Sequence, residues 1–298
     1  MLMSADRTGI VSQDRPAGRV SETLPWVAIA WFGVLLIACY GPVLFRLAAQ
    51  WAHDEDMGHG FFVPLIAGYI VWQRRHELAE VKASPNWWGL AVIAWGAAQL
   101  YVATLGAELF LARTAFIVSL FGIVLLLGGT PVLRIVAFPL GLLFFMVPIP
   151  AILYNQVTFR LQQLASRLAE IALGILGVPV LREGNILELA SQRLSVVEAC
   201  SGIRSLLTLS FLSLVYAYFF DKKVWMRAAL LAATIPIALV ANASRITIAA
   251  LLSEVNPKLA EGMFHTASGW VIFMVGLLLL VGVHALINRS LKVFYARG

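Results

Sequence analysis

The sequence predicts an all-α membrane protein of about eight transmembrane helices, with a small external element made of an amphipathic helix and a β-hairpin. Of the 298 residues, 60% are hydrophobic and only 13% are charged. A soluble domain carries about a quarter charged residues, so this chain has too few charges to cover a water-exposed surface. The third observation is a series of apolar runs long enough to cross a bilayer. The same composition excludes disordered, collagen-like and disulfide-scaffold proteins.

The apolar runs define the domain organisation. Residues 1–24 are polar and predict a cytoplasmic tail, residues 25–290 form one polytopic membrane domain, and residues 291–298 form a second cytoplasmic tail. The first run, about 25–47, is too long for a signal-peptide core and lacks a small-residue cleavage site. Seven more follow at about 60–73, 87–105, 110–128, 132–153, 203–220, 226–244 and 264–288. The 60–73 run is short for a span, so a tilted, an extended and a partly re-entrant segment all stay open.

The distribution of basic residues orients these helices. An even number of spans puts both termini on one side. Thirteen Lys and Arg residues then lie on the side of the termini, against four in the short loops opposite. Short loops rich in Lys and Arg stay in the cytoplasm, so both termini are predicted to be cytoplasmic. The basic residues of one turn, Lys222, Lys223 and Arg227, are interpreted as topology signals only.

One segment, about 154–200, is too polar to lie within the membrane. Residues 155–177 have apolar positions at helical spacing, which predicts an amphipathic interfacial helix. Residues 179–197 then alternate between apolar and polar around Glu183, Gly184 and Asn185, which predicts one or two β-hairpins. On the predicted topology this element lies outside the cytoplasm.

Three residues attract attention because the topology brings them to one membrane face. Cys200 precedes the sixth predicted helix, Arg245 follows the seventh, and His265 begins the eighth. These helices alternate in direction, so all three residues fall at the external face. Composition alone does not require a thiol, a guanidinium and an imidazole at the same level.

These three groups together are typical of cysteine-dependent acyl transfer. A helix N-terminus lowers the pKa of a thiol and favours the nucleophilic thiolate. A histidine exchanges protons with the leaving and attacking groups, and an arginine stabilises an oxyanion. Each residue also has a simpler interpretation: Cys200 as a packed small side chain, Arg245 as an anchor to lipid phosphates, and His265 as an interfacial residue without a role.

Other candidates are secondary. His59, Glu198, Arg204 and Asn242 are predicted to bind or orient substrate, because they flank the same external site. The segment 51–62 holds two His and three acidic residues. It fits no trusted metal spacing, so a solvated acidic loop is the favoured interpretation and neither a metal nor another cofactor is expected. Cys39 is predicted to be packed in the core. No nucleotide-binding glycine motif is present.

At these residues the sequence resembles the exosortases, bacterial inner-membrane relatives of the archaeosortases. The resemblance lies in four ordered segments, GHGFFVPLIAGYIVWQRR, VVEACSGIRSLL, NASRITIAALL and FHTASGWVIF, and covers roughly residues 50–290. It implies a multi-pass cysteine transpeptidase whose catalytic Cys, Arg and His correspond to Cys200, Arg245 and His265. It also implies a role in bacteria that make exopolysaccharide.

The resemblance further implies the partners. The substrates would be membrane-anchored proteins with a C-terminal sorting signal, consisting of a Pro-Glu-Pro motif, a transmembrane helix and a basic cluster. The bilayer is the other partner, an amine or water is the acceptor, and nucleic acid is not expected. The active site would face the periplasm. The rival interpretation is a transporter, flippase or scaffold subunit for exopolysaccharide export, which predicts broken helices in symmetric positions or charges at mid-membrane.

Overall fold

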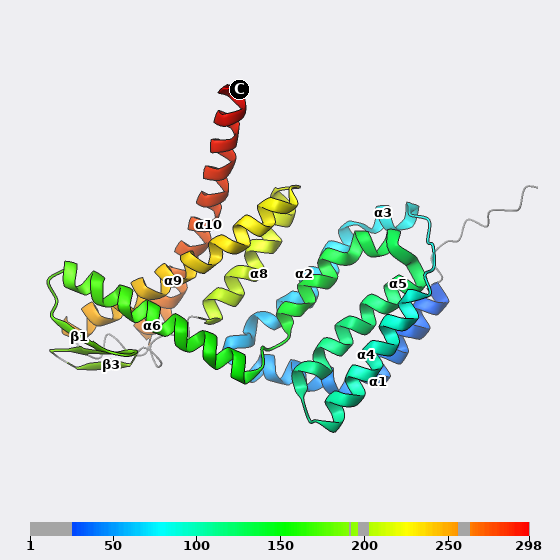
Figure 1. Cartoon of the computed structure of the whole chain (residues 1–298), viewed down its shortest axis with the longest axis horizontal. Helices are drawn as coiled ribbons and strands as arrows, with labels where there is room; N and C mark the ends of the chain where they lie inside the picture. The colour runs from blue at the N-terminus through cyan, green and yellow to red at the C-terminus, as the bar shows by residue number, and fades with distance from the viewer. Residues whose placement is uncertain (1–25, 191, 196–202, 256–262, 298) are drawn as a thin grey trace, which may run out of the picture.

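The computed structural model describes residues 26–190, 192–195, 203–255 and 263–297, without the side chains of Trp26, Glu55, 263–268 and 294–297. Figure 1 shows α1, α4 and α5 on one side, α8–α10 on the other, and α6 with a small sheet beneath the second group. The elements are α1 (Trp26–His53), the 3₁₀ helix η1 (Glu55–Phe61), α2 (Phe62–Gln73), α3 (Arg75–Glu80), α4 (Trp88–Leu105), α5 (Leu109–Leu142), the 3₁₀ helix η2 (Leu143–Met146), α6 (Ala151–Ile175), β1 (Val180–Glu183), β2 (Ile186–Leu189), β3 (Arg193–Ser195), α8 (Ile203–Phe220), α9 (Val224–Val255) and α10 (Met263–Arg297).

The all-α membrane class is confirmed, but the expected count of eight spans is not matched. Within the described residues, six helical segments are long and apolar enough to cross a membrane. The predicted run 110–128 and most of the run 132–153 fall in one candidate span, Leu109–Met146, which is interrupted by non-helical backbone at Gly129. The predicted run at 60–73 yields α2, whose 12 residues are too few to count as a span.

α5 bends sharply at Gly129, between the predicted runs 110–128 and 132–153, so it consists of two helical parts joined across a kink (Figure 1). Gly129 has φ 74° and ψ −169°, a conformation that a residue with a side chain rarely adopts. A Cβ atom there would collide with the carbonyl of Ser84, and the Ser84 N–H donates to the Gly128 carbonyl at 3.2 Å. The loop before α4 therefore packs directly against the backbone of the bend.

Several polar side chains of α1, α4 and α5 hydrogen-bond across the contacts between these helices. The Tyr40 hydroxyl lies 2.8 Å from Ser119 Oγ and donates to the Ala115 carbonyl at 3.2 Å. Gln99 Nε2 donates to Thr114 Oγ1 at 2.7 Å. A Cβ atom on Gly96 would collide with Ser119 Oγ, so α4 and α5 approach closely through a small residue, as membrane helices commonly do.

The prediction for Cys39 on α1 is wrong. Cys39 was expected to be packed in the core, yet it is exposed on α1. α1 is apolar around its whole circumference, so the spacing of its residues does not indicate which face meets protein and which meets lipid.

The external element has the predicted form. β1, β2 and β3 make an antiparallel sheet, and Glu183 pairs with Ile186 across the two-residue turn at Gly184 and Asn185. Gly184 has φ 66°, which suits such a turn. α6 and the sheet pack on α9 through buried residues that include Ala165, Ala169, Leu173, Leu187, Ala243, Ile246 and Ala250.

α9 and α10 are both longer than predicted. α9 was expected to end near residue 244, but it continues through Arg245 to Val255. Its extra residues are helical because they bury one face, at Ile246 and Ala250, against the external element. α10 continues to Arg297, so the predicted tail at 291–298 is helical that far; no Gly or Pro interrupts it after Leu286.

Candidate active site

Arg245 contacts α10 directly, across a glycine. A Cβ atom on Gly269 would lie 3.2 Å from Arg245 Cζ and 3.3 Å from both Nη atoms. Because Gly269 has no side chain, the guanidinium lies against the backbone of α10. Arg245 Nε is buried, so the charge of this side chain is held at the α9–α10 contact rather than in open solvent.

The glycine that Arg245 contacts lies one helical turn after His265. Residues four apart share a helix face, and His265 belongs to the first turn of α10. The side chain of His265 lies outside the described part of the structure. The backbone nevertheless brings Arg245 to Gly269, one turn into α10 from the position of His265.

The position of Arg245 along α9 also fits a membrane edge. Arg227 lies in the first turn of α9, and Arg245 lies well along the same helix. A helix rises about 1.5 Å per residue, so the two lie about 27 Å apart, close to the roughly 30 Å of the hydrocarbon core. If Arg227 marks one edge, Arg245 lies near the other.

Asn242 shares the helix face of Arg245, three residues earlier. The residue is buried, and its Nδ2 has no hydrogen-bond acceptor among the described residues. A buried amide that lacks an acceptor costs about 1–3 kcal/mol. The predicted substrate-binding role of Asn242 therefore has a donor in place for a carbonyl group.

Cys200 and Glu198 lie outside the described residues, just before α8 begins at Ile203. Arg204, in the first turn of α8, is described. Its Nε lies 2.7 Å from Asp56 Oδ1, with side chains that are 44% and 22% exposed. The start of α8 is thus tied to η1, a segment from a much earlier part of the chain.

Asp56 is the centre of a polar network around η1. Its second oxygen accepts a hydrogen bond from the Tyr154 hydroxyl of α6. Its backbone N–H donates to Asp54 Oδ1 at 2.9 Å, which caps η1. Burial raises the pKa of the Tyr154 hydroxyl, and the hydrogen bond to Asp56 raises it further. Tyr154 therefore keeps its proton and donates it, so η1, α6 and α8 are joined through one carboxylate.

His59 also lies in η1 but is turned inward. Its Nε2 is 3.2 Å from the Phe145 carbonyl, and its Nδ1 is buried without a hydrogen-bond partner among the described residues. Burial lowers the pKa of the imidazole, so His59 is neutral near pH 7. Its predicted contact with substrate stays a prediction; in this conformation the ring holds η1 against the end of η2.

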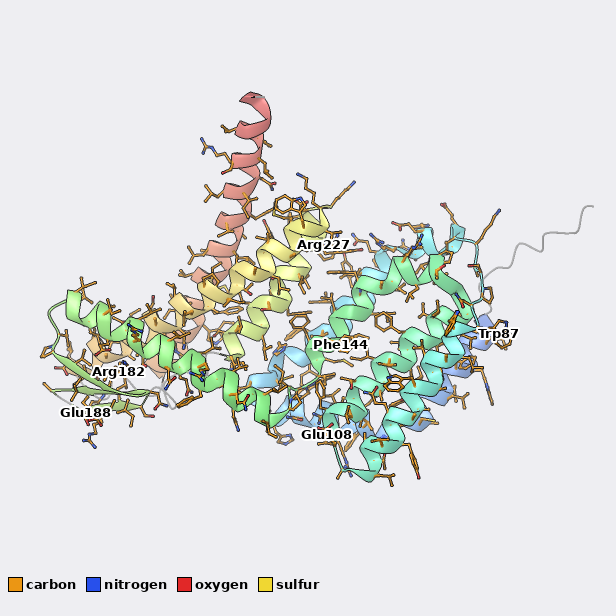
Figure 2. All side chains as sticks on the ribbon, in the orientation of Figure 1. Trp87, Glu108, Phe144, Arg182, Glu188 and Arg227 are labelled. Atoms are coloured by element: carbon orange, nitrogen blue, oxygen red, sulfur yellow. The ribbon has the colours of Figure 1, made fainter. Side chains whose placement is uncertain are left out.

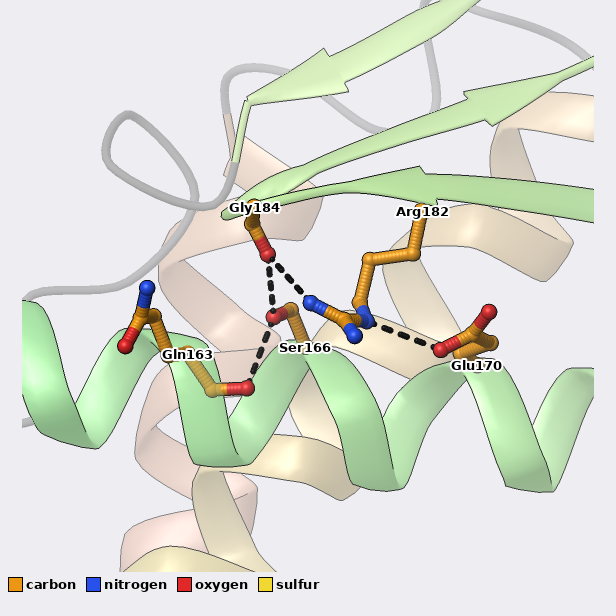
Figure 3. A network of polar contacts seen from close by, with 5 residues as sticks. All are labelled: Gln163, Ser166, Glu170, Arg182 and Gly184. Carbon is orange, nitrogen blue, oxygen red and sulfur yellow. Dashed lines mark hydrogen bonds and ion pairs between the residues drawn. The ribbon is translucent and has the colours of Figure 1, made fainter.

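The sheet of β1, β2 and β3 is fastened to α6 by a second polar network (Figure 3). Arg182 Nε lies 2.8 Å from Glu170 Oε2, and Arg182 Nη1 donates to the Gly184 carbonyl at 2.9 Å. Ser166 Oγ donates to the same carbonyl at 3.1 Å. The turn between β1 and β2 is therefore fixed over α6, which itself packs beside Arg245 through Ala243 and Ile246.

The described acidic and histidine side chains of the 51–62 segment form no group of metal ligands. Within the described ranges, no three His, Cys, Asp or Glu side chains are placed to hold a metal ion. The interpretation of Asp56 as part of a solvated acidic loop is wrong, because its carboxylate is paired with Arg204 and with the Tyr154 hydroxyl.

Comparison with known proteins decides the family. The family model of the transmembrane exosortases matches residues 51–282. The chain belongs to the exosortase family. No curated protein and no solved structure matches it. Exosortases are in general membrane cysteine transpeptidases, and they act on membrane-associated substrates that carry sorting signals.

Three contributors to this exosortase's site were not singled out from the sequence. Tyr154 looked like one of many residues of an amphipathic helix, and Asp56 like one acid of a solvated loop. Gly269 carried a weak signal: it is a small residue one turn after His265, where close approach of another group is possible. Only the contact with Arg245 shows what that space accommodates.

Proposed function

We propose that this exosortase is a cysteine peptidase or transpeptidase that cleaves C-terminal sorting signals of the Pro-Glu-Pro type. Cys200, Arg245 and His265 are its catalytic residues. His59, Glu198, Arg204 and Asn242 bind or orient the substrate. The site faces the periplasm of a bacterial inner membrane, with both termini in the cytoplasm, where thirteen of the Lys and Arg residues then lie.

One observation carries the proposal: the Arg245 guanidinium lies against Gly269, one turn from His265. This contact with bare backbone holds the guanidinium at the start of α10, where substrate and His265 would meet. The match to the exosortase family covers the part of the chain that contains all three residues. The tie between Arg204 and Asp56 supports a fixed start of α8, directly after Cys200.

The chemistry follows from these groups. The thiolate of Cys200 forms a bond to the scissile carbonyl carbon, and Arg245 stabilises the oxyanion. His265 protonates the leaving amine as the carbon–nitrogen bond breaks, which leaves a thioacyl enzyme. An incoming amine or water then loses a proton to His265, attacks the thioacyl carbon and releases Cys200. Asn242 Nδ2, buried near Arg245, donates to a substrate carbonyl.

Mass spectrometry of a candidate substrate tests this proposal. Cells with the active protein should yield a new C-terminus on the substrate, whereas Cys200→Ala and Cys200→Ser should accumulate the uncleaved form. Membrane insertion of both variants is checked by immunoblot. Cleavage that survives both substitutions would contradict the proposal.

The same experiment addresses the rival functions. A transporter, flippase or scaffold subunit would be nearly indifferent to the loss of one sulfur atom, so export of polysaccharide would continue with Cys200→Ala. Fusions of alkaline phosphatase and of a fluorescent protein at residues 81 and 221 test the orientation. Both positions should be cytoplasmic, so phosphatase activity at either would contradict the topology.

A further inference from the structure

The end of the molecule opposite the candidate active site carries two arginines on stacked aromatic rings. Phe138 of α5 and Tyr218 of α8 stack with ring centroids 4.5 Å apart and an interplanar angle of 7°. Arg227 Cζ lies 5.0 Å from the first centroid and 5.1 Å from the second. Arg74 Cζ, after the end of α2, lies 5.4 Å from the Tyr218 centroid.

We call Arg74 and Arg227 the arginine pair. Both lie over the Tyr218 ring, so their Cζ atoms are no farther apart than the sum of their distances to the centroid of that ring. They come from segments that lie far apart in the sequence. Figure 2 labels Arg227 at the end of α9 that lies away from the sheet, which Arg182 and Glu188 mark.

Further aromatic and basic residues surround the arginine pair. The ring centroids of Tyr69 of α2 and Phe219 of α8 lie 6.3 Å apart, and this contact joins the ends of the two helices. Arg75 Cζ lies 4.4 Å from the Trp72 ring, and Lys223 Nζ lies 5.9 Å from the Trp225 ring. Aromatic and basic side chains of this kind gather where membrane helices reach the lipid headgroups.

The positive charge of the arginine pair is poorly balanced within the described part of the chain. Glu77 Oε2 is 3.8 Å from Arg74 Nη1, but the Glu77 side chain is 60% exposed. Asp221, in the turn before α9, is directed elsewhere: it accepts from the Lys223 N–H at 2.8 Å and lies 3.4 Å from His284 Nε2. Neither acid lies within ion-pair distance of Arg227.

Arg227 also lacks a hydrogen-bond acceptor. Its Nε is buried and has no partner among the described residues. A guanidinium stacked against rings is stabilised through its face, and its N–H donors point outward in the plane. Such donors match the oxygens of a phosphate, which an arginine binds in a bidentate manner.

We propose that the arginine pair binds the phosphate of an anionic lipid headgroup. The phosphate oxygens accept from the N–H edges of Arg74 and Arg227, and the acyl chains lie along α2 and α8 below the aromatic rings. The two candidate spans Ile203–Phe220 and Val224–Val255 end and begin here, so a headgroup, rather than a soluble anion, is the phosphate that meets this level most often. Arg227 therefore does more than signal topology.

The test uses the full chain in phosphatidylcholine nanodiscs with increasing fractions of phosphatidylglycerol, and measures the melting temperature. The wild-type protein should be stabilised by phosphatidylglycerol in a saturable way. Arg74→Gln/Arg227→Gln should raise the half-saturating fraction about tenfold or more, since two charge-assisted contacts are lost. Arg134→Gln/Arg289→Gln removes the same charge from exposed positions and should change it less than about twofold.

Each remaining outcome decides something. An equal loss in the control variant would show a general charge effect and overturn the site. Stabilisation by inorganic phosphate in pure phosphatidylcholine, lost in the same arginine variant, would overturn the lipid assignment in favour of a soluble anion. If the double variant does not fold, the wild-type titration and the variant Tyr218→Leu still test the site. A wild-type protein whose melting temperature does not change with phosphatidylglycerol overturns the proposal.

Discussion

Two arginines of α9 lie in contrasting surroundings. Arg227 lies near aromatic rings at one end of the helix, and Arg245, farther along the same helix, lies against the bare backbone of Gly269. The rings of Phe138 and Tyr218 stabilise the charge of Arg227 through the face of its guanidinium. A glycine contact adds little stabilisation but fixes the position of the guanidinium. In the proposed functions, the same residue type binds a lipid headgroup at Arg227 and stabilises an oxyanion at Arg245.

The largest expected effect separates the two ends by function. Arg245→Lys keeps the charge but loses the planar donors, so substrate cleavage should fall about 100-fold or more. Its response to phosphatidylglycerol should persist. Cleavage is measured by mass spectrometry of the substrate's C-terminus, and melting follows the lipid response.

Arg134→Lys, at an exposed position, is the control for this substitution and should cleave like the wild type. If Arg245→Lys also cleaves normally, a planar guanidinium is not required for cleavage. The different surroundings of Arg227 and Arg245 then do not reflect different functions.

A smaller effect is expected from moving the Arg245 guanidinium without changing it. The Cβ atom of Gly269→Ala would press on Arg245 at 3.2–3.3 Å, so the side chain must shift by a few tenths of an ångström. Cleavage should fall about tenfold, with little loss of stability. Gly276→Ala is the matched control on α10, because its Cβ would meet Ile237 and Leu209 at 3.7 and 3.9 Å. Equal rates in both variants would refute the positioning role of Gly269.

Arg204 offers a third setting, in which a carboxylate balances the arginine. A double-mutant cycle of Asp56→Asn and Arg204→Gln should give a coupling of about 1 kcal/mol, because the pair is only partly exposed. The pair Glu188–Arg193, at 2.6 Å with Arg193 78% exposed, should give almost none. Detergent-induced unfolding measures both, and similar values would show that the η1–α8 tie is an ordinary surface pair.

The smallest effect is in pH dependence, and it too differs between the ends. Burial lowers the pKa of His59 below 6.5, so the unfolded chain binds more protons here, and stability is lost as pH falls below about 6.5. The backbone N–H of Lys223 lowers the pKa of Asp221 below 3.8, so its contribution is lost only under about pH 3.8. Melting curves from pH 8 to 5 should show a slope that His59→Gln reduces and His53→Gln does not. If His59→Gln leaves the slope unchanged, another group causes the pH dependence of the melting temperature.

Much of the fold could be predicted from local pattern. The apolar runs, the amphipathic α6 and the turn at Gly184 depend on residues near one another in the chain, so periodicity and turn chemistry suffice. The break between the predicted helices 110–128 and 132–153 falls at Gly129, where the backbone is non-helical; what the sequence did not indicate is the fit of Ser84, from another loop, against that glycine. The face of α1 that carries Cys39 was predicted wrongly, since an apolar helix in lipid has no favoured side in its own sequence.

By itself, the sequence determined that this exosortase is a helical membrane protein, because hydropathy is a property of single segments; that one membrane face holds both Arg245 and His265 stays a prediction from the order of the helices. The tertiary structure decided which side chains meet: Gly269 with Arg245, Asp56 with Arg204 and Tyr154, and the arginine pair with the rings of Phe138 and Tyr218. These contacts join residues far apart in the chain, and the close packing that selects them depends on every helix at once.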